Sequence, residues 1–161
     1  DFIQNVARQG KPVNLKKGQF LSPEEMRGPV KKIEQAGCRN VMLTERGTFF
    51  GYHRLVNDFI GIGDLLSLDV GEAGSPPVCF DATHSDQLPG LSATTGGRRE
   101  RIPLLAKAAA AAGIHAMFME CHPEPEKAHS DAATALHLDG VPALLETLAR
   151  IVEASRGGTA R

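Results

Sequence analysis

Short, continuous apolar runs alternate along this chain with longer amphipathic segments, and this alternation limits the folds that the sequence can adopt. Four of the apolar runs are predicted to be strands, at residues 12–17, 40–45, 77–83 and 115–120. Strands that are apolar throughout are typical of parallel sheets, because helices cover such sheets and bury them. Strand and helix follow each other repeatedly, so the sequence predicts an α/β fold with a parallel sheet and right-handed crossovers.

The helical segments carry signals at their ends. Helices are predicted at residues 23–37, 98–113 and 139–155, and another helix precedes the first strand. Ser22 is placed to cap the first of these three, and Gly37 follows its last turn. Pro29 lies inside the same segment and should kink or weaken the helix, since proline lacks a backbone N–H.

Composition excludes some classes of protein and favours one globular domain. The 161 residues include 18 basic and 19 acidic side chains, so no global charge favours binding to nucleic acid or to an anionic membrane. No apolar run reaches the roughly 18 residues of a membrane span, and no signal-peptide pattern is present. The three cysteines are odd in number, which is typical of reduced thiols in a cytoplasmic protein.

Each predicted strand ends in polar residues that are able to bind ligands. These are Lys16, Lys17 and Gln19; Glu45 and Arg46; Asp81, Thr83 and His84; and Glu120 and His122. In parallel α/β sheets the carboxyl ends of the strands form the ligand-binding edge, in barrels and in open sheets alike. The sequence therefore predicts a binding site at this edge.

Two groups, drawn from this set and from Asp131 further along the chain, have distinct chemistry. Lys16 and Arg46 form a pair of cations that suits a phosphate or a carboxylate. A set of one histidine and two acids (His84, Glu120 and Asp131) suits a divalent metal ion of intermediate softness. Each residue also has a purely structural interpretation: Lys16 as a surface lysine, Arg46 as the partner of its neighbouring glutamate, and Asp131 as a turn residue.

At these residues the chain resembles the 3-deoxy-D-manno-octulosonate 8-phosphate synthases, which condense phosphoenolpyruvate with D-arabinose 5-phosphate for lipopolysaccharide biosynthesis. The matching stretches are KPVNLKKGQFLSP, LTERGTFFGYHRLVNDF, FDATHSDQLPG, TGGRRE and FMECHPEPEKAHSDA. The related heptulosonate-phosphate synthases, which use erythrose 4-phosphate, share the ERG and HP.P..A.SD patterns. They are not expected to carry FGY or ATHS.QLPG, so the eight-carbon family is favoured.

The resemblance implies a TIM (β/α)8 barrel, of which this chain supplies about the last four β/α units. The matches begin where the family's fifth strand begins, so residues 1–161 are expected to be the C-terminal half of one barrel domain, with residues 155–161 a flexible tail. The resemblance also implies a cytoplasmic homotetramer. Two alternatives stay open: a synthase that uses erythrose 4-phosphate, and a catalytically inactive, truncated half-barrel.

The resemblance assigns substrate roles to particular residues. Lys16 and Arg46 would bind phosphoenolpyruvate, with Gln87 near the same substrate, and Thr95 would donate a hydrogen bond to the phosphate of the aldose phosphate. Lys16, as a proton donor, and His84 would be the catalytic residues. The sequence departs from the family pattern in three places: the stretch GLSATTGG around Thr95 is one residue shorter, the loop around Gly71 is longer, and His53 and Arg54 replace an asparagine pair. These departures bear on the sugar-phosphate side more than on the phosphoenolpyruvate side.

The resemblance also assigns a metal site. His84, Glu120 and Asp131 would bind a divalent ion (Zn, Fe, Mn or Co) in the metal-dependent branch of the family, whereas the other branch uses no metal. Cys121 directly follows Glu120, the last residue of the fourth predicted strand. Neighbouring strand residues point to opposite faces, so Cys121 is not expected to be a ligand.

Overall fold

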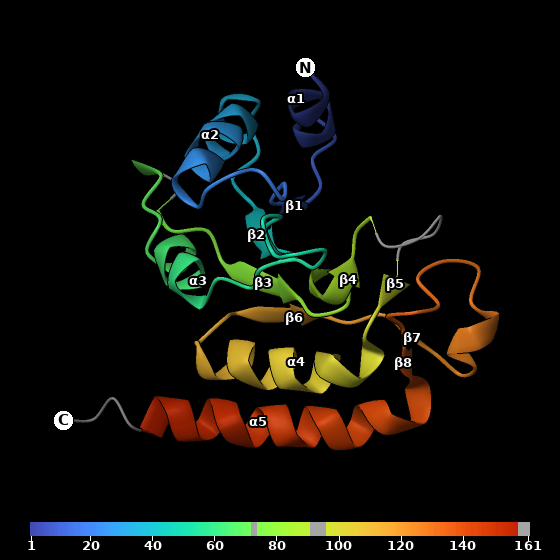
Figure 1. Ribbon diagram of the computed structural model, residues 1–161. Coiled ribbons are helices and arrows are strands. Elements are labelled where there is room, and N and C mark those ends of the chain that lie inside the picture. The colour runs from blue at the N-terminus through green and yellow to red at the C-terminus, as the bar shows by residue number, and fades with distance from the viewer. Residues whose placement is uncertain (72–73, 91–95, 158–161) are drawn as a thin grey trace.

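A four-stranded parallel sheet forms the centre of the computed structural model, which describes residues 1–71, 74–90 and 96–157 (Figure 1). The strand order is β1-β2-β3-β6, and every neighbouring pair is parallel. The strands are β1 (Val13–Lys16), β2 (Val41–Glu45), β3 (Val78–Asp81) and β6 (Ala116–Phe118). All four predicted strands and their sequential order are confirmed, each strand being shorter than the apolar run that predicted it.

Within the described residues, five α-helices accompany the sheet. They are α1 (Phe2–Ala7), α2 (Arg27–Gln35), α3 (Phe59–Leu66), α4 (Ile102–Ala111) and α5 (Val141–Gly157). In Figure 1 they lie along one side of the sheet, from α2 past α3 to α4, and α5 packs on the outside of α4. Helix α3 is implied by the alternation of strands and helices, but its bounds were not predicted. Asp58 caps it by accepting hydrogen bonds from the N–H groups of Ile60 and Gly61.

Three of the predicted helices begin with a 3-10 turn. These turns are Glu24–Met26, Arg99–Arg101 and Leu138–Gly140. Pro29 consequently falls in the first turn of α2 and does not interrupt it, so the predicted kink is wrong; N–H groups in a first turn have no partner within the helix. Helix α5 extends to Gly157, two residues beyond the predicted helix, and residues 158–161 of the predicted tail lie outside the described residues.

Two small pairs of strands at the carboxyl edge were not predicted. β4 (Gln87–Leu88) pairs with β5 (Gly96–Gly97) in antiparallel fashion, and β7 (Cys121–His122) pairs with β8 (Leu136–His137) in parallel. A Cβ atom at Gly97 would collide with the methyl group of Thr134, so the glycine allows β5 to lie close to Thr134. The pairings hold together the loops that follow β3 and β6.

The two faces of the sheet differ in chemistry. On the helix side, Leu43, Val78 and Phe80 are fully buried in apolar cores shared with the helices. The alternate residues point to the other side, where Thr44 contacts Asn14 and where Lys16 contacts Asp81 and lies over the Phe118 ring. The face away from the helices, called the polar face below, therefore carries the polar side chains of Asn14, Lys16, Thr44 and Asp81 beside apolar ones, and it ends at the carboxyl edge.

The cysteines are all free, Cys38 and Cys79 being buried and Cys121 exposed. Burial raises the pKa of the Cys79 thiol, although a hydrogen bond with Thr44 acts in the opposite direction. Across the described ranges, no helix combines the length and the apolar character needed to cross a membrane.

Candidate functional site

The carboxyl edge of the sheet brings together the predicted site residues that the structure describes. Lys16 ends β1, Arg46 follows β2, and His84 lies three residues after β3. Gln87 begins β4, and Glu120 lies two residues after β6. Asp131 comes from the turn before β8. Thr95 lies outside the described residues, so its predicted role is not addressed by the structure.

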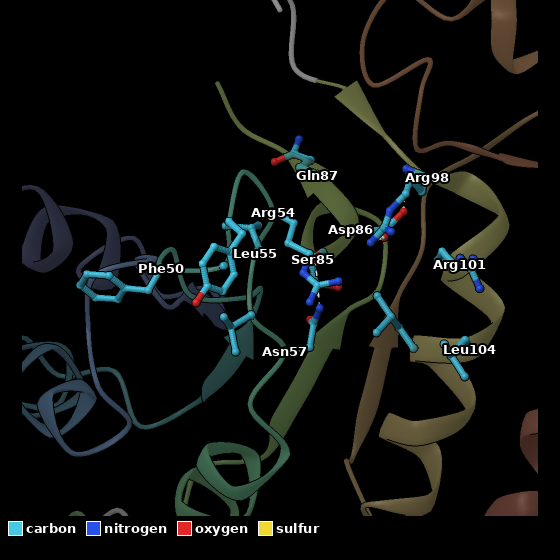
Figure 2. A pocket seen from close by; sticks show the side chains of 14 residues that line it. Phe50, Arg54, Leu55, Asn57, Ser85, Asp86, Gln87, Arg98, Arg101 and Leu104 are labelled. Carbon is cyan, nitrogen blue, oxygen red and sulfur yellow. Dashed lines mark hydrogen bonds and ion pairs between the residues drawn. The ribbon is translucent and has the colours of Figure 1, made fainter. Parts of the chain in front are cut away.

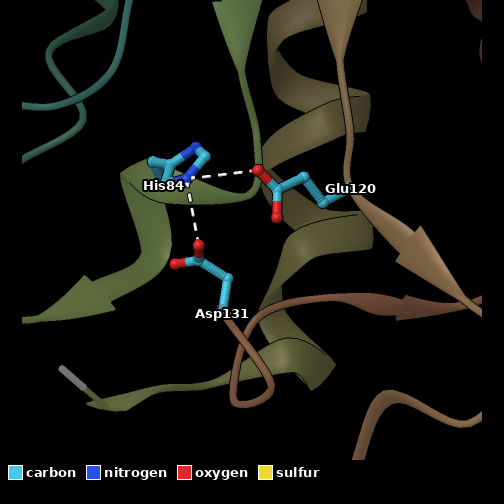
Figure 3. Close-up of side chains that lie close together, drawn as sticks. All are labelled: His84, Glu120 and Asp131. Carbon is cyan, nitrogen blue, oxygen red and sulfur yellow. Dashed lines mark ion pairs between the residues drawn. The ribbon is translucent and has the colours of Figure 1, made fainter. Parts of the chain in front are cut away.

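His84, Glu120 and Asp131 converge on a small space (Figure 3). The Nε2 atom of His84 lies 3.4 Å from Oε1 of Glu120 and 3.7 Å from Oδ2 of Asp131, and the three ligand atoms all lie within 4.8 Å of one another. Two ligands at about 2.1 Å from a tetrahedral ion are about 3.4 Å apart, so this spacing fits a zinc-like ion. Cys121 is not part of this group.

The backbone at Asp131 has an unusual conformation that directs its side chain to this group. Its φ angle is +52°, in the left-handed region that aspartate tolerates better than most residues. Its carbonyl oxygen accepts hydrogen bonds from the N–H groups of Thr134 (2.9 Å) and Ala135 (2.8 Å), which fix the turn. Strained backbone of this kind is concentrated at functional sites.

A buried carboxylate, Asp81, joins Lys16 to His84. Its Oδ2 atom accepts a hydrogen bond from Nζ of Lys16 at 2.7 Å and lies 2.8 Å from Nδ1 of His84. Its Oδ1 atom accepts a hydrogen bond from the backbone N–H of His84 at 2.9 Å. The sequence placed Asp81 among the strand-end residues but gave it no role. Its position as the last residue of an apolar run was the available signal, because a buried carboxylate needs a partner.

Gln87 makes a second link, between Arg46 and Asp131. Nη2 of Arg46 donates to Oε1 of Gln87 at 2.7 Å, and Nε2 of Gln87 donates to Oδ1 of Asp131 at 3.1 Å. Burial lowers the pKa of the Arg46 guanidinium, and the negative charges of Asp81, Glu45 and Asp131 act against this shift. The Nη1 atom of Arg46 is buried without a hydrogen-bond partner among the described residues, so it remains able to donate to a ligand.

A buried ion pair is formed by Lys17 and Glu45, the sequence neighbours of Lys16 and Arg46. The side chains of Lys17 and Glu45 are 2% and 5% exposed, with Nζ and Oε2 3.4 Å apart. Lys17 also donates to the hydroxyl group of Thr48 at 3.3 Å. The other oxygen of Glu45 accepts from the N–H groups of Arg46 (2.9 Å) and Gly47 (2.7 Å). Glu45 therefore holds the backbone of Arg46 and pairs with Lys17, which differs from the alternative that Arg46 is the partner of Glu45.

A cavity of about 580 Å³ lies beside these residues (Figure 2). It is lined by the loop at residues 50–57, by Asp86 and Gln87, and by residues of the segment 98–105. Burial raises the pKa of the Asp86 carboxyl, and its hydrogen bond from the N–H of Arg98 (2.8 Å) acts against this shift. Gln87 alone is shared with the links described above, so the cavity adjoins the site and does not contain it.

Comparisons with known proteins identify relatives of this chain. Residues 1–155 match the model of the DAHP synthetase I family. The 2-dehydro-3-deoxyphosphooctonate aldolase of Alkalilimnicola ehrlichii is 49% identical over 158 residues, which cover 98% of this chain and 55% of the relative. The proteins of the same name from Nitrosococcus oceani (51% over 152 residues; 94% and 52%) and Dichelobacter nodosus (52% over 149 residues; 92% and 52%) are similar to the same extent. The chain spans about half the length of the curated relatives it matches.

Proposed function

The chain belongs to the DAHP synthetase I family, and we propose that the whole protein condenses phosphoenolpyruvate with D-arabinose 5-phosphate. Water is consumed, and 3-deoxy-D-manno-octulosonate 8-phosphate and phosphate are formed. The proposal rests on one observation: a single side chain joins each cation to the group formed by His84, Glu120 and Asp131. Asp81 joins Lys16 to His84, and Gln87 joins Arg46 to Asp131. An anion held by the cations would therefore lie beside a bound metal ion.

Lys16 and Arg46 hold phosphoenolpyruvate in this proposal. Both are cations at the ends of neighbouring strands, and Nη1 of Arg46, which has no hydrogen-bond partner among the described residues, is able to donate to a phosphate or carboxylate oxygen. The side chain of Lys16 is 44% exposed, so its ammonium group can reach a substrate as well as Asp81 and can donate a proton. Gln87 lies beside the same substrate, and Thr95 binds the phosphate of the sugar.

His84, Glu120 and Asp131 would hold a divalent ion such as Zn, Fe, Mn or Co. The fit rests on the donor set, one ring nitrogen and two carboxylates, and on separations that suit a tetrahedral ion. When bound, such an ion polarises the sugar aldehyde or positions a water molecule. The chain's own residues orient the ligand atoms through Asp81 and Gln87.

We further propose that the fold is a (β/α)8 barrel to which residues 1–161 contribute the C-terminal half. Three features support this assignment: the strands are parallel, they follow in sequential order, and the helices lie on one side of the sheet. In a doubly wound sheet helices would cover both faces, whereas in a barrel they all lie outside. The polar face of the sheet would then point into the barrel.

The proposed state of the protein is a cytoplasmic homotetramer. Several large apolar side chains are exposed among the described residues, in particular Phe20 (75% exposed), Phe50 (79%) and Tyr52 (93%). Their exposure supports a subunit interface. The three free thiols support a reducing compartment.

Phosphate release from phosphoenolpyruvate, measured with each of two sugars, tests the proposed reaction. We expect kcat/KM with D-arabinose 5-phosphate to exceed that with D-erythrose 4-phosphate by at least about 10²-fold, because a site built around the longer sugar leaves polar groups unpaired with the shorter one. A preference for erythrose 4-phosphate would assign the protein to heptulosonate-phosphate synthesis. Absence of release with both sugars would support an inactive half-barrel.

A further inference from the structure

Asp81 contacts two residues of the proposed site, Lys16 and His84, a role that no sequence pattern indicated. Its side chain is completely buried, and both of its oxygen atoms are used. One oxygen contacts Nζ of Lys16 and Nδ1 of His84, and the other accepts the backbone N–H of His84. Lys16 at the end of β1 and His84 in the 3-10 turn after β3 thus share one carboxylate, and His84 is held by both its ring and its backbone.

These contacts determine which nitrogen of the His84 ring carries hydrogen. An ionised carboxylate can only accept hydrogen bonds, so Nδ1 at 2.8 Å from Asp81 carries the hydrogen. In the neutral ring the lone pair is then on Nε2, and Nε2 is the atom that faces Glu120 and Asp131. The tautomer set by Asp81 is the one that can bind a metal ion through Nε2.

Lys16 completes this arrangement. A buried carboxylate needs a positive partner to remain ionised, and the ammonium group of Lys16 at 2.7 Å supplies it. Phe118 packs against both neighbours, with Nζ of Lys16 5.2 Å from the centre of its ring and the His84 ring 5.8 Å away. The Lys16 ammonium group, the Asp81 carboxylate and the His84 ring are therefore linked in series, and Phe118 packs against both ends of the series.

We propose that Asp81 is a positioning residue that fixes the His84 tautomer for metal binding and ties Lys16 to the same point. The link to metal binding rests on the proposed function, whereas the tautomer is a property of the protein alone. Outer carboxylates that accept a hydrogen bond from a metal-binding histidine commonly raise metal affinity by about 10- to 100-fold.

The Asp81→Asn substitution separates this role from simple packing, because asparagine has nearly the same shape. The amide of asparagine can lie in two orientations. In each, its NH2 group replaces an oxygen atom of Asp81 that accepted a hydrogen bond, so the NH2 group faces a donor. The backbone N–H of His84 cannot turn away, whereas Lys16 is partly exposed and can turn to water. The amide oxygen should therefore accept from the backbone, and the NH2 group should donate to Nδ1 of the ring. This hydrogen bond selects the opposite tautomer, with hydrogen on Nε2.

Long-range ¹H–¹⁵N NMR of the histidine rings, on the whole purified protein without metal, tests the proposal. At a pH where the ring is neutral, we expect His84 of the unmodified protein to carry hydrogen on Nδ1, and that of the Asp81→Asn variant to carry it on Nε2. Titration with Mn²⁺ alone should give about 10- to 100-fold weaker binding by the variant. Asp86→Asn, which changes another buried carboxylate of the same segment, should alter neither result.

The outcomes separate this proposal from the proposed function. Hydrogen on Nε2 of His84 in the unmodified protein would overturn it, whether or not the Asp81→Asn variant folds. An unchanged tautomer and unchanged Mn²⁺ affinity in a folded variant would also overturn it. If the tautomer changes as expected but the unmodified protein binds no Mn²⁺, the positioning role of Asp81 stands and the proposed metal site is wrong.

Discussion

Replacing Arg46 with methionine should lower kcat/KM for phosphoenolpyruvate by about 10²- to 10³-fold, the loss typical when one preorganised donor to a charged group is removed. The guanidinium is held by Gln87, and its buried Nη1 donor has no hydrogen-bond partner in the part of the chain that the structure describes, so its position is set before substrate arrives. Methionine keeps much of the length of the side chain and removes both charge and donors. Steady-state kinetics with phosphoenolpyruvate as the varied substrate measures the effect.

Two further variants define the cause of that loss. Arg46→Lys keeps the charge but not the planar set of donors, so an intermediate loss is expected. Arg150→Met removes an exposed guanidinium on the outer helix α5 and should leave the kinetics unchanged. If Arg46→Met retained kcat/KM within twofold of the unmodified protein, Arg46 would have no role in binding phosphoenolpyruvate.

Replacing Lys17 with methionine should lower the free energy of unfolding by about 3–5 kcal/mol, because it leaves the Glu45 carboxylate buried without its positive partner. That carboxylate also accepts the N–H groups of Arg46 and Gly47, so it cannot leave the interior without disturbing the loop after β2. Urea denaturation followed by circular dichroism measures the change.

A double substitution and an exposed pair serve as controls. Lys17→Met combined with Glu45→Leu removes both charges and should recover much of the lost stability, since apolar residues can replace a buried pair. Lys32→Met breaks an ion pair of 3.0 Å with Asp1, but Lys32 is 53% exposed, and the free energy of unfolding should change little. Equal losses for Lys17→Met and Lys32→Met would show that burial of the pair contributes nothing.

The sheet could be predicted because its information is local. Each strand is a short apolar run, and a parallel sheet places the polar residues that follow such runs at one edge. This reasoning located the edge where Lys16, Arg46 and His84 lie. The same local information cannot give the bounds of α3, in which two glycines weaken the helical pattern, or of two-residue strands such as β4.

The partners of the charged residues could not be predicted, because they depend on register and on distant parts of the chain. Lys16 and Lys17 are adjacent and chemically identical, yet one faces Asp81 across the polar side of the sheet and the other is buried against Glu45. Alternation along a strand separates them, but only the pairing of strands decides which lysine faces the site. The link through Gln87 likewise joins residues that are distant in the sequence. Arg46 lies 41 residues before Gln87, and Asp131 lies 44 residues after it.

In the proposed active site, an anion site and a metal site meet at the carboxyl edge of the sheet. A crystal structure of the whole protein grown with phosphoenolpyruvate and Mn²⁺, with the metal located by anomalous scattering, tests this arrangement most directly. We expect an anomalous peak bonded to His84, Glu120 and Asp131, with the phosphate or carboxylate of phosphoenolpyruvate in contact with Lys16 and Arg46. Manganese bound away from His84, or phosphoenolpyruvate bound away from both cations, would contradict it.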